Sequence, residues 1–267
     1  MTMGMFFWVK KVVSALIVAA DGSGDYTDIQ SAIDALPATG GEIHVKAGTY
    51  IITTGITINK SNVTIVGSGF STIIQTTSNI SIFYASSKTN IDISNLYILG
   101  AGAGHTDNLA FEYATVTYSK IKYCKIDSVG SFGVYLSTTS SNNIISNNII
   151  SNCVYDGIYT SNGTNNLIIN NTCTSNGFNG IRCDFGTEII HGNFCYSNTL
   201  SGILVGQTTS VNSAVTSNVC NSNAKYGIYI FASAANTVVS NNTCKLNTIG
   251  QILDEGSGTQ IGHNITS

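Results

Sequence analysis

One glycine followed by an apolar residue recurs through the second half of the chain at an almost constant interval. Its copies are Gly133, Gly157, Gly180, Gly202 and Gly227, with a weaker copy at Gly250. The intervals between them are 24, 23, 22, 25 and 23 residues. Self-similarity at such a period is typical of repeat architectures, in which each repeat packs on its neighbours. The chain is therefore expected to form a solenoid.

The repeat unit has the character of strands rather than helices. β-branched pairs recur in the copies, at Ile144-Ile145, Ile168-Ile169, Ile189-Ile190 and Val238-Val239. Such residues favour strands, and the Ala, Leu and Glu richness of helical repeats is missing. The leucine ladder of leucine-rich repeats is missing too. The sequence predicts an all-β fold, a single-stranded right-handed parallel β-helix (solenoid) of about 10 coils with a short N-terminal capping α-helix.

Two further positions repeat in phase with the glycines. Asparagine recurs nine residues or so before them, at Asn148, Asn171, Asn193, Asn218 and Asn242. Cysteine follows two residues later, at Cys173, Cys195, Cys220 and Cys244. Equivalent side chains of stacked coils form ladders, so we expect an Asn ladder with amide hydrogen bonds along the axis. Stacked side chains suit disulfide geometry poorly, so the cysteines are expected to be mostly free, buried thiols.

Composition limits the classes of partner. Charged residues make up 9% of the 267 residues, against roughly 25% in an ordinary soluble domain. The net charge is −3 and Arg182 is the only arginine. Nucleic acid is not an expected partner, because phosphate binding needs clustered basic residues. No apolar stretch is long enough for a transmembrane helix, and the cysteine spacing gives no metal site.

The N-terminus admits two interpretations. Residues 1–14 form an apolar leader or a disordered terminus, and residues 15–267 form the β-helix domain. Lys10 and Lys11 precede an apolar run that ends in Ala19-Ala20, which imitates a short signal peptide. Alternatively, residues 15–20 are the first strand of the domain. The sequence does not decide between these two.

A capping helix is predicted next, over about residues 27–36, with regular repeats over about 119–260. Thr27 and Gln30 have the spacing of a capping box, and Pro37 ends the helix. One face is apolar, so the helix can cover the open end of the first coil and remove an exposed sheet edge.

The stretch from Val18 to Tyr50, VAADGSGDYTDIQSAIDAL followed by GGEIHVKAGTY, resembles the N-terminal cap of the pectin-lyase-like superfamily. That superfamily includes pectinesterases, pectate lyases and phage tailspike proteins. The later SNNTC and GIYI segments are similar to NosD-type β-helix repeats. The two resemblances cover about residues 15–265. They imply a fold more strongly than an activity, because one scaffold hosts many functions.

The catalytic signatures that the resemblance implies are missing. Asp184-Phe185-Gly186 is only a fragment of the pectinesterase-like segment, and His191-Gly192 lacks the glycine that precedes histidine in polygalacturonase-like enzymes. The Asp-Pro-His-Glu of mannuronan-epimerase-like sites is excluded, because the one proline is Pro37.

The repeat phase nevertheless marks a surface. Residues two after each glycine are expected to point outward when their neighbours point inward. This rule and the positions just before the glycines give a candidate substrate-binding stripe of Tyr135, Tyr159, Arg182, Tyr226 and Tyr229. Aromatic faces beside hydrogen-bonding groups suit sugar rings. The alternative is an ordinary tyrosine ladder that stacks only for stability.

Catalytic residues are unknown from the sequence, with Arg182, Asp156 and Asp184 as weak candidates. For Arg182, a plain salt bridge with Asp184 or Asp156 is favoured over a role as catalytic base. Asp107 and Glu112 could act as acid and base only if the fold brought their carboxyl groups 5–10 Å apart. No cofactor is expected, and Asp254-Glu255 are the candidates for a Ca²⁺ ion.

Three functions remain open. The first is an extracellular or virion/cell-surface β-helix that binds or contacts polysaccharide or a cell-surface glycan without catalysis. The second is a polysaccharide lyase or glycoside hydrolase, and the third is a purely structural assembly protein. Residues 251–267 show no helix to cover the last coil, so a homo-oligomer through the C-terminal coil is also expected.

Overall fold

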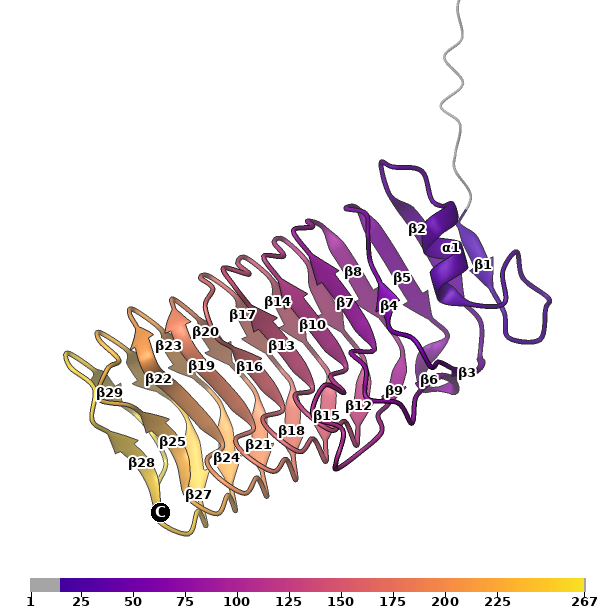
Figure 1. Cartoon of the computed structure of the whole chain (residues 1–267). Coiled ribbons are helices and arrows are strands. Elements are labelled where there is room, and N and C mark those ends of the chain that lie inside the picture. Colours follow the sequence, from indigo (N-terminus) through magenta and orange to yellow (C-terminus); the bar gives the residue numbers. More distant parts are fainter. Residues whose placement is uncertain (1–14, 267) are drawn as a thin grey trace, which may run out of the picture.

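The computed structural model describes residues 15–266, which form a parallel β-helix with one short helix at its N-terminal end (Figure 1). The strands of successive coils pair in parallel and build three long sheets. Sheet A has eleven strands, and sheets B and C have nine each. The predicted solenoid fold is therefore confirmed.

Each coil supplies one strand to each sheet, in the order A, B, C. Sheet A consists of β1 Leu16–Val18, β2 Gly41–Val45, β5 Val63–Gly67, β8 Ile91–Ser94, β11 Lys120–Lys122, β14 Ile144–Ser146, β17 Leu167–Ile169, β20 Ile189–His191, β23 Ala214–Thr216, β26 Val238–Ser240 and β29 Gln260–Gly262. Sheet B consists of β3 Gly48–Ile51, β6 Thr72–Gln75, β9 Tyr97–Leu99, β12 Lys125–Asp127, β15 Ile149–Ser151, β18 Thr172–Thr174, β21 Phe194–Tyr196, β24 Val219–Asn221 and β27 Thr243–Lys245. Sheet C consists of β4 Ile56–Thr57, β7 Phe83–Ser86, β10 Phe111–Ala114, β13 Val134–Ser137, β16 Ile158–Thr160, β19 Ile181–Gly186, β22 Ile203–Ser210, β25 Tyr226–Ile230 and β28 Gly250–Asp254. A 3₁₀ turn, Gly69–Ser71, precedes β6.

The repeating glycine stands where the chain enters sheet C, and its lack of a side chain is a packing requirement. A Cβ atom on Gly157 would lie 2.7 Å from the carbonyl oxygen of Gly180, and one on Gly180 would lie 2.7 Å from that of Gly202. Cβ atoms do not approach backbone oxygens so closely. The coils can therefore stack at this corner only when each carries glycine, which explains the repeat.

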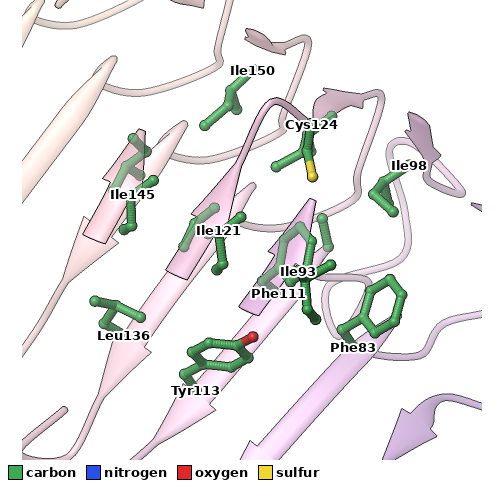
Figure 2. Packing of buried hydrophobic residues seen from close by; sticks show 14 of the residues in the cluster. Phe83, Ile93, Ile98, Phe111, Tyr113, Ile121, Cys124, Leu136, Ile145 and Ile150 are labelled. Carbon is green, nitrogen blue, oxygen red and sulfur yellow. The ribbon is translucent and has the colours of Figure 1, made fainter. Parts of the chain in front are cut away.

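The core is a stack of small and β-branched side chains inside the three sheets. Cys173, Cys195 and Cys220 occupy equivalent positions on neighbouring strands of sheet B, and all seven cysteines are free and buried. Larger rings fill the N-terminal half, where Phe83 and Phe111 stack with centroids 5.2 Å apart (Figure 2). The predicted ladder of free thiols is confirmed.

The predicted Asn ladder lies at the corner between sheets A and B. Asn171 Nδ2 donates to Asn193 Oδ1 at 3.1 Å, and Asn193 Nδ2 donates to Asn218 Oδ1 at 3.0 Å. Each amide also donates to a backbone carbonyl of the preceding coil, as Asn193 does to Ile168 at 2.8 Å. These bonds satisfy backbone groups that the turn buries, so the ladder is confirmed as a structural device.

Helix α1, Ile29–Ala35, packs Ile29, Ala32 and Ile33 on the N-terminal end of the core. The predicted capping box is wrong. Asp28 is the N-cap, and its Oδ1 accepts from Ser31 N at 2.8 Å. Gln30 is engaged elsewhere, because its side-chain amide pairs with both backbone groups of Thr57 at the edge of β4. The need to cover that edge overrides the capping role.

The two chain ends bear on the remaining expectations. Leu16–Val18 form β1, which pairs with β2, while residues 1–14, where the leader was predicted, lie outside the described residues. Within residues 15–266 no helix is long and apolar enough to cross a membrane. The last coil ends in β28 and β29, with Ile261 half exposed, and a homo-oligomer there stays a prediction.

Candidate functional site

The candidate stripe lies on the outer face of sheet C. Because side chains alternate along a strand, the register fixes which residues of successive coils share that face. Tyr135 pairs with Tyr159, Tyr159 with Arg182, and Arg182 with Leu204. Leu204 pairs in turn with Tyr229. The sheet therefore brings these residues into one row along the axis.

A second row follows the corner where sheet B turns into sheet C, and we call it the corner ridge. It consists of Tyr155, Phe178, Leu200 and Lys225, one residue per coil. Backbone hydrogen bonds between coils hold it, for example from Phe178 N to Tyr155 O at 3.2 Å and from Leu200 N to Phe178 O at 2.9 Å. Lys225 N donates to Leu200 O at 2.9 Å. The ridge runs beside the row on sheet C.

Aromatic rings join the two rows at their N-terminal end. Phe132 lies with its centroid 5.2 Å from Tyr135, 5.3 Å from Tyr155 and 5.1 Å from Tyr159. Tyr155 meets Phe178 edge-on at 5.1 Å. Tyr135 and Tyr159 stack almost parallel at 5.1 Å. The rings therefore form one cluster rather than separate platforms.

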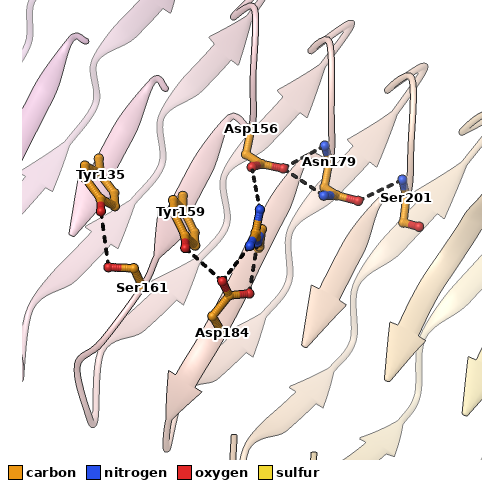
Figure 3. Close-up of polar contacts among 8 residues, drawn as sticks. Tyr135, Asp156, Tyr159, Ser161, Asn179, Asp184 and Ser201 are labelled. Carbon is orange, nitrogen blue, oxygen red and sulfur yellow. Dashed lines mark hydrogen bonds and ion pairs between the residues drawn. The ribbon is translucent and has the colours of Figure 1, made fainter. Parts of the chain in front are cut away.

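Arg182 is held on several sides, in part by Tyr159 and Asp184, whose hydrogen bond to each other is drawn in Figure 3. Its Nε donates to Asp184 Oδ1 at 2.9 Å and its Nη2 to Asp184 Oδ2 at 2.6 Å. The guanidinium lies over the Tyr159 ring, 4.5 Å from the centroid. Tyr159 is thus covered by Tyr135 on one face and by Arg182 on the other, and its hydroxyl donates to Asp184 at 2.8 Å. A sugar ring cannot stack on Tyr159 in this arrangement.

Asp156 directly precedes the repeat glycine Gly157 and lies beneath the row, with 1% of its surface exposed. Its Oδ1 accepts from the backbone N and from Nδ2 of Asn179, each at 2.8 Å. Its Oδ2 has no hydrogen-bond donor, and Arg182 Nη1 is 4.0 Å away. Burial raises the pKa of Asp156 to about 6, although the Asn179 hydrogen bonds and Arg182 favour the charged form. This carboxyl group titrates near neutral pH.

Two cavities flank Arg182 and Phe178, which line both. The small cavity has a volume of about 190 Å³ and is lined by Phe132, Tyr155, Asp156, Phe178 and Arg182. The large cavity has a volume of about 440 Å³, and its walls include Asn179, Ser201, Lys225, Tyr226, Tyr229 and Glu255. Because they share two walls, the cavities adjoin one another along the helix axis.

The large cavity has aromatic and charged walls. Tyr229 lies 5.4 Å from Tyr226 and from Phe231, with the rings tilted by 50° and 53°. Its hydroxyl donates to Glu255 Oε2 at 2.7 Å. Burial and this hydrogen bond raise the pKa of Tyr229 to about 12. Unlike Tyr159, Tyr229 is tilted from its neighbours and borders open space.

The comparisons with known proteins agree with this architecture. The model of the right-handed β-helix region matches residues 113–266, and the pectinesterase model matches residues 15–106. The chain belongs to the right-handed β-helix family. A comparison with curated protein sequences finds no significant match.

Solved structures with this fold come from several sources. The A-module of mannuronan C-5 epimerase AlgE4 of Azotobacter vinelandii superposes with a TM-score of 0.79 at 18% identity, over 88% of this chain and 71% of that one. Pectin methylesterase from carrot gives 0.66 at 17% identity, over 96% and 89%. ORF18 of Geobacillus virus E2 gives 0.65 at 16%, over 93% of this chain and 60% of that one. At such identities the likeness establishes the fold alone.

The structure places the five stripe residues predicted from the sequence at one continuous site. Tyr135, Tyr159 and Arg182 belong to the aromatic cluster, and Tyr226 and Tyr229 line the large cavity. The two carboxylates named with them, Asp156 and Asp184, are both buried.

The other carboxylates proposed from the sequence are engaged separately. Asp107 Oδ2 accepts from Asn79 Nδ2 at 2.9 Å, and Glu112 Oε2 accepts from Ser81 Oγ at 2.5 Å. Asp254 accepts from the backbone of Gly256, while Glu255 is bound by Tyr229. Over the described range 15–266, no three His, Cys, Asp or Glu residues gather as a metal site would require.

Sequence reasoning missed Phe132, Phe178 and Lys225. The corner ridge occupies the position two residues before each repeat glycine, so its period was present in the sequence. The alternation of inward and outward side chains along strands does not predict the orientation of these residues, because they lie in a turn. The signal that could have found Phe178 is the apolar or aromatic residue that recurs at this offset in Tyr155, Phe178 and Leu200. Lys225 shares the offset without that character, and Phe132 directly precedes Gly133.

Proposed function

We propose that this protein binds polysaccharide along the outer face of sheet C and does not cleave it. The observation that carries the proposal is the pair of adjoining cavities, which together give a bound chain aromatic walls and polar groups over several coils. Sugar rings use both kinds of contact, the apolar face of the ring on aromatics and the hydroxyls on amides and charges. An extended row suits a polymer better than a small metabolite.

Three features support the large cavity as the main contact surface. Tyr229 borders open space, whereas Tyr159 is covered on both faces. Lys225 is exposed at its rim and forms no ion pair among the described residues. Asn179 and Ser201 line its wall with hydrogen-bonding groups.

The state of the carboxylates supports binding without catalysis. Asp184 is fixed by Arg182 and by the Tyr159 hydroxyl, and Asp156 is buried. A general acid or base must reach the substrate proton, directly or through one water molecule. With the side chains as they stand in the unliganded chain, neither carboxyl group reaches a substrate proton.

Solved relatives with this fold supply the context for the substrate class. They include a mannuronan epimerase, a pectin methylesterase and a periplasmic alginate epimerase, which are polysaccharide-modifying enzymes, and a viral protein. On this analogy we place the protein outside the cytosol, at a cell or virion surface. A glycan is then its partner.

An enzymatic function is the second candidate, and one observation favours it. The pKa of Asp156 is raised by burial to about 6, which is the range of a general acid at neutral pH. A lyase or hydrolase activity would require the side chains over Asp156 to move aside. Product formation that disappears in Asp156→Asn would establish this candidate.

The proposal is tested by measuring binding to a panel of neutral and acidic polysaccharides with affinity electrophoresis. Tyr229→Ala and Tyr226→Ala should each weaken binding about tenfold, because buried aromatic contacts dominate such interfaces. Tyr123→Ala is the matched control, since Tyr123 is 51% exposed and lines neither cavity. Equal binding by all three variants and the unaltered protein would refute the proposal.

A further inference from the structure

The small cavity combines three aromatic walls with an unsatisfied acidic oxygen. Phe132, Tyr155 and Phe178 surround it, and Asp156 and Arg182 complete its lining. Oδ2 of Asp156 is buried without any hydrogen-bond donor. Buried polar atoms are nearly always hydrogen-bonded, so an orphaned oxygen of this kind needs an explanation.

The neighbouring arginine does not satisfy this oxygen. Nε and Nη2 of Arg182, one planar edge of the guanidinium, are used by Asp184, and its ring-facing side lies on Tyr159. Nη1 stays 4.0 Å from Asp156 Oδ2, beyond hydrogen-bond distance. Arg182 is thus fixed in place but does not donate a hydrogen bond to Asp156 Oδ2.

The charges around the cavity add to a negative value. Arg182 is balanced by Asp184, and an ionised Asp156 leaves one negative charge over. Lys225, the next cation along the ridge, lines the large cavity and not the small one. A carboxylate of an acidic sugar would meet this charge unfavourably, whereas a cation would be attracted to it.

Aromatic faces strengthen the same preference. A cation near the face of an aromatic ring is attracted by the ring's negative face, and the attraction grows when water is excluded. Sugars carry a cation when an amine replaces a hydroxyl group and is protonated. Resting on the proposed glycan-binding function, we propose that the small cavity is a subsite for the protonated amine of an amino sugar, with Asp156 as its counter-ion.

Entry to the subsite needs a moving wall, since Asp156 Oδ2 is closed from water in the unliganded chain. Arg182 is held by Asp184 and Tyr159, so it is the fixed wall. Phe178 is 39% exposed and touches Tyr155 only edge-on, so it is the wall that swings. Because Phe178 also lines the large cavity, a chain bound there reaches the subsite directly.

The test compares three hexasaccharides with the same backbone linkage, namely those of glucosamine, N-acetylglucosamine and glucose. Isothermal titration calorimetry at pH 7 should show the glucosamine hexamer binding at least tenfold more tightly than the other two. The N-acetylglucosamine hexamer lacks the charge and also carries a bulky acetyl group, whereas the glucose hexamer lacks only the charge. Comparing their affinities separates the effect of charge from that of size. Equal affinity for the amine and the hydroxyl hexamer would overturn the inference.

Asp156→Asn provides the decisive variant. Asparagine can keep the acceptor for Asn179, so the corner is expected to fold unchanged, but the charge is gone. The variant should bind the three hexamers within about threefold of one another. Asp127→Asn is the control, because Asp127 is a carboxylate on the outer face of sheet B, away from both cavities. It should retain the tenfold preference.

The pH profile gives a readout that a structural role would not change. Lowering the pH from 7 to 5 protonates Asp156, which should weaken binding of the glucosamine hexamer by up to about tenfold. The ligand amine becomes more protonated over the same range, so it cannot cause the loss. Arg182 and Asp184, the charged side chains nearest to Asp156, form an ion pair with each other.

The outcomes separate this inference from the proposed function. If other glycans bind through Tyr229 while the amine gives no preference, the subsite assignment fails and the binding function stands. If no glycan binds at all, both fail. A preference for the amine that persists in Asp156→Asn would show that another group recognises it, and the assignment would be wrong.

Discussion

Replacing Glu188 with glutamine is expected to stabilise the protein at neutral and alkaline pH. Glu188 lies fully buried at the corner after β19, where the preceding coils carry the buried amides Asn143 and Asn166. Its two carboxyl oxygens accept from the backbone N of Asn166 at 2.7 Å and from its Nδ2 at 3.1 Å. In this coil a glutamate carboxyl group thus occupies the buried position that an asparagine amide holds in the two preceding coils.

The magnitude follows from the pKa of this group. Burial raises the pKa of Glu188 from 4.5 to about 8, although the hydrogen bonds from Asn166 favour the charged form. Between these values the folded chain binds one more proton than the unfolded chain, so stability falls as the pH rises. At about 1.4 kcal/mol for each pH unit, the loss is about 3 kcal/mol at pH 7 and about 5 kcal/mol above pH 8.

The assay is urea unfolding of the unaltered protein and of Glu188→Gln from pH 5 to pH 9. Glutamine mimics the protonated carboxyl group, so the two proteins should differ little at pH 5, and the variant should become the more stable as the pH rises. Glu112→Gln should show no such divergence, because Glu112 lies on the outer face of β10, where its Oε2 accepts from the Ser81 hydroxyl. A stability difference that is independent of pH would contradict the reasoning, because Glu188 would then not titrate in this window.

Three smaller changes test other parts of the fold by the same unfolding assay. Asn193→Ala should cost about 2–4 kcal/mol, since it leaves the buried backbone and side-chain N–H groups of Asn171 without acceptors; a loss below 1 kcal/mol would contradict the ladder's role. Tyr113→Phe should leave stability unchanged or raise it by about 1 kcal/mol, because the buried Tyr113 hydroxyl has no partner; a clear loss would reveal one. Lys60→Met should cost about 1–2 kcal/mol, because Nζ of Lys60 donates to three carbonyls at the end of α1, and an unchanged midpoint would show that water replaces it.

The fold was predictable because the same few residues recur at a fixed period. The glycines before sheet C and the ladder around Asn193 have no alternative to stacking in register, since each needs the next coil to avoid a clash or to satisfy an amide. The row that contains Tyr159 and Arg182 followed from alternation along strands. These are the parts where local pattern and global fold agree.

Other features depended on competition between neighbours. Thr27 and Asp28 both have the spacing of an N-cap. Asp28 is the N-cap in the structure, because Gln30, the expected partner of Thr27, is bonded to Thr57 at the edge of β4. The burial of Asp156 depends on Asn179 of the next coil, which the spacing of single residues does not show. Glu188 continues a second ladder, formed by Asn143 and Asn166 in the two preceding coils. A search of the sequence that allowed a carboxylate at an asparagine position of the repeat would have found it.

The large cavity and the small cavity were beyond strand alternation for a related reason. Of the two residues that line both cavities, Phe178 lies at a corner, where the backbone turns. The alternation of side chains along a strand does not apply there. The open space beside Tyr229 is set by how far its ring tilts from Tyr226. Such tilts arise from packing in three dimensions and have no counterpart in the sequence.

The measurement that tests the central account most directly is a glycan-array screen of the protein, followed by mass spectrometry of each bound polysaccharide after prolonged incubation. The account predicts binding to a defined set of glycans that is weakened about tenfold in Tyr229→Ala and kept in Tyr123→Ala, with every polysaccharide recovered at its original mass. Shortened or unsaturated products would contradict it and make the protein an enzyme. Binding that is unchanged in Tyr229→Ala would contradict the placement of the site on sheet C.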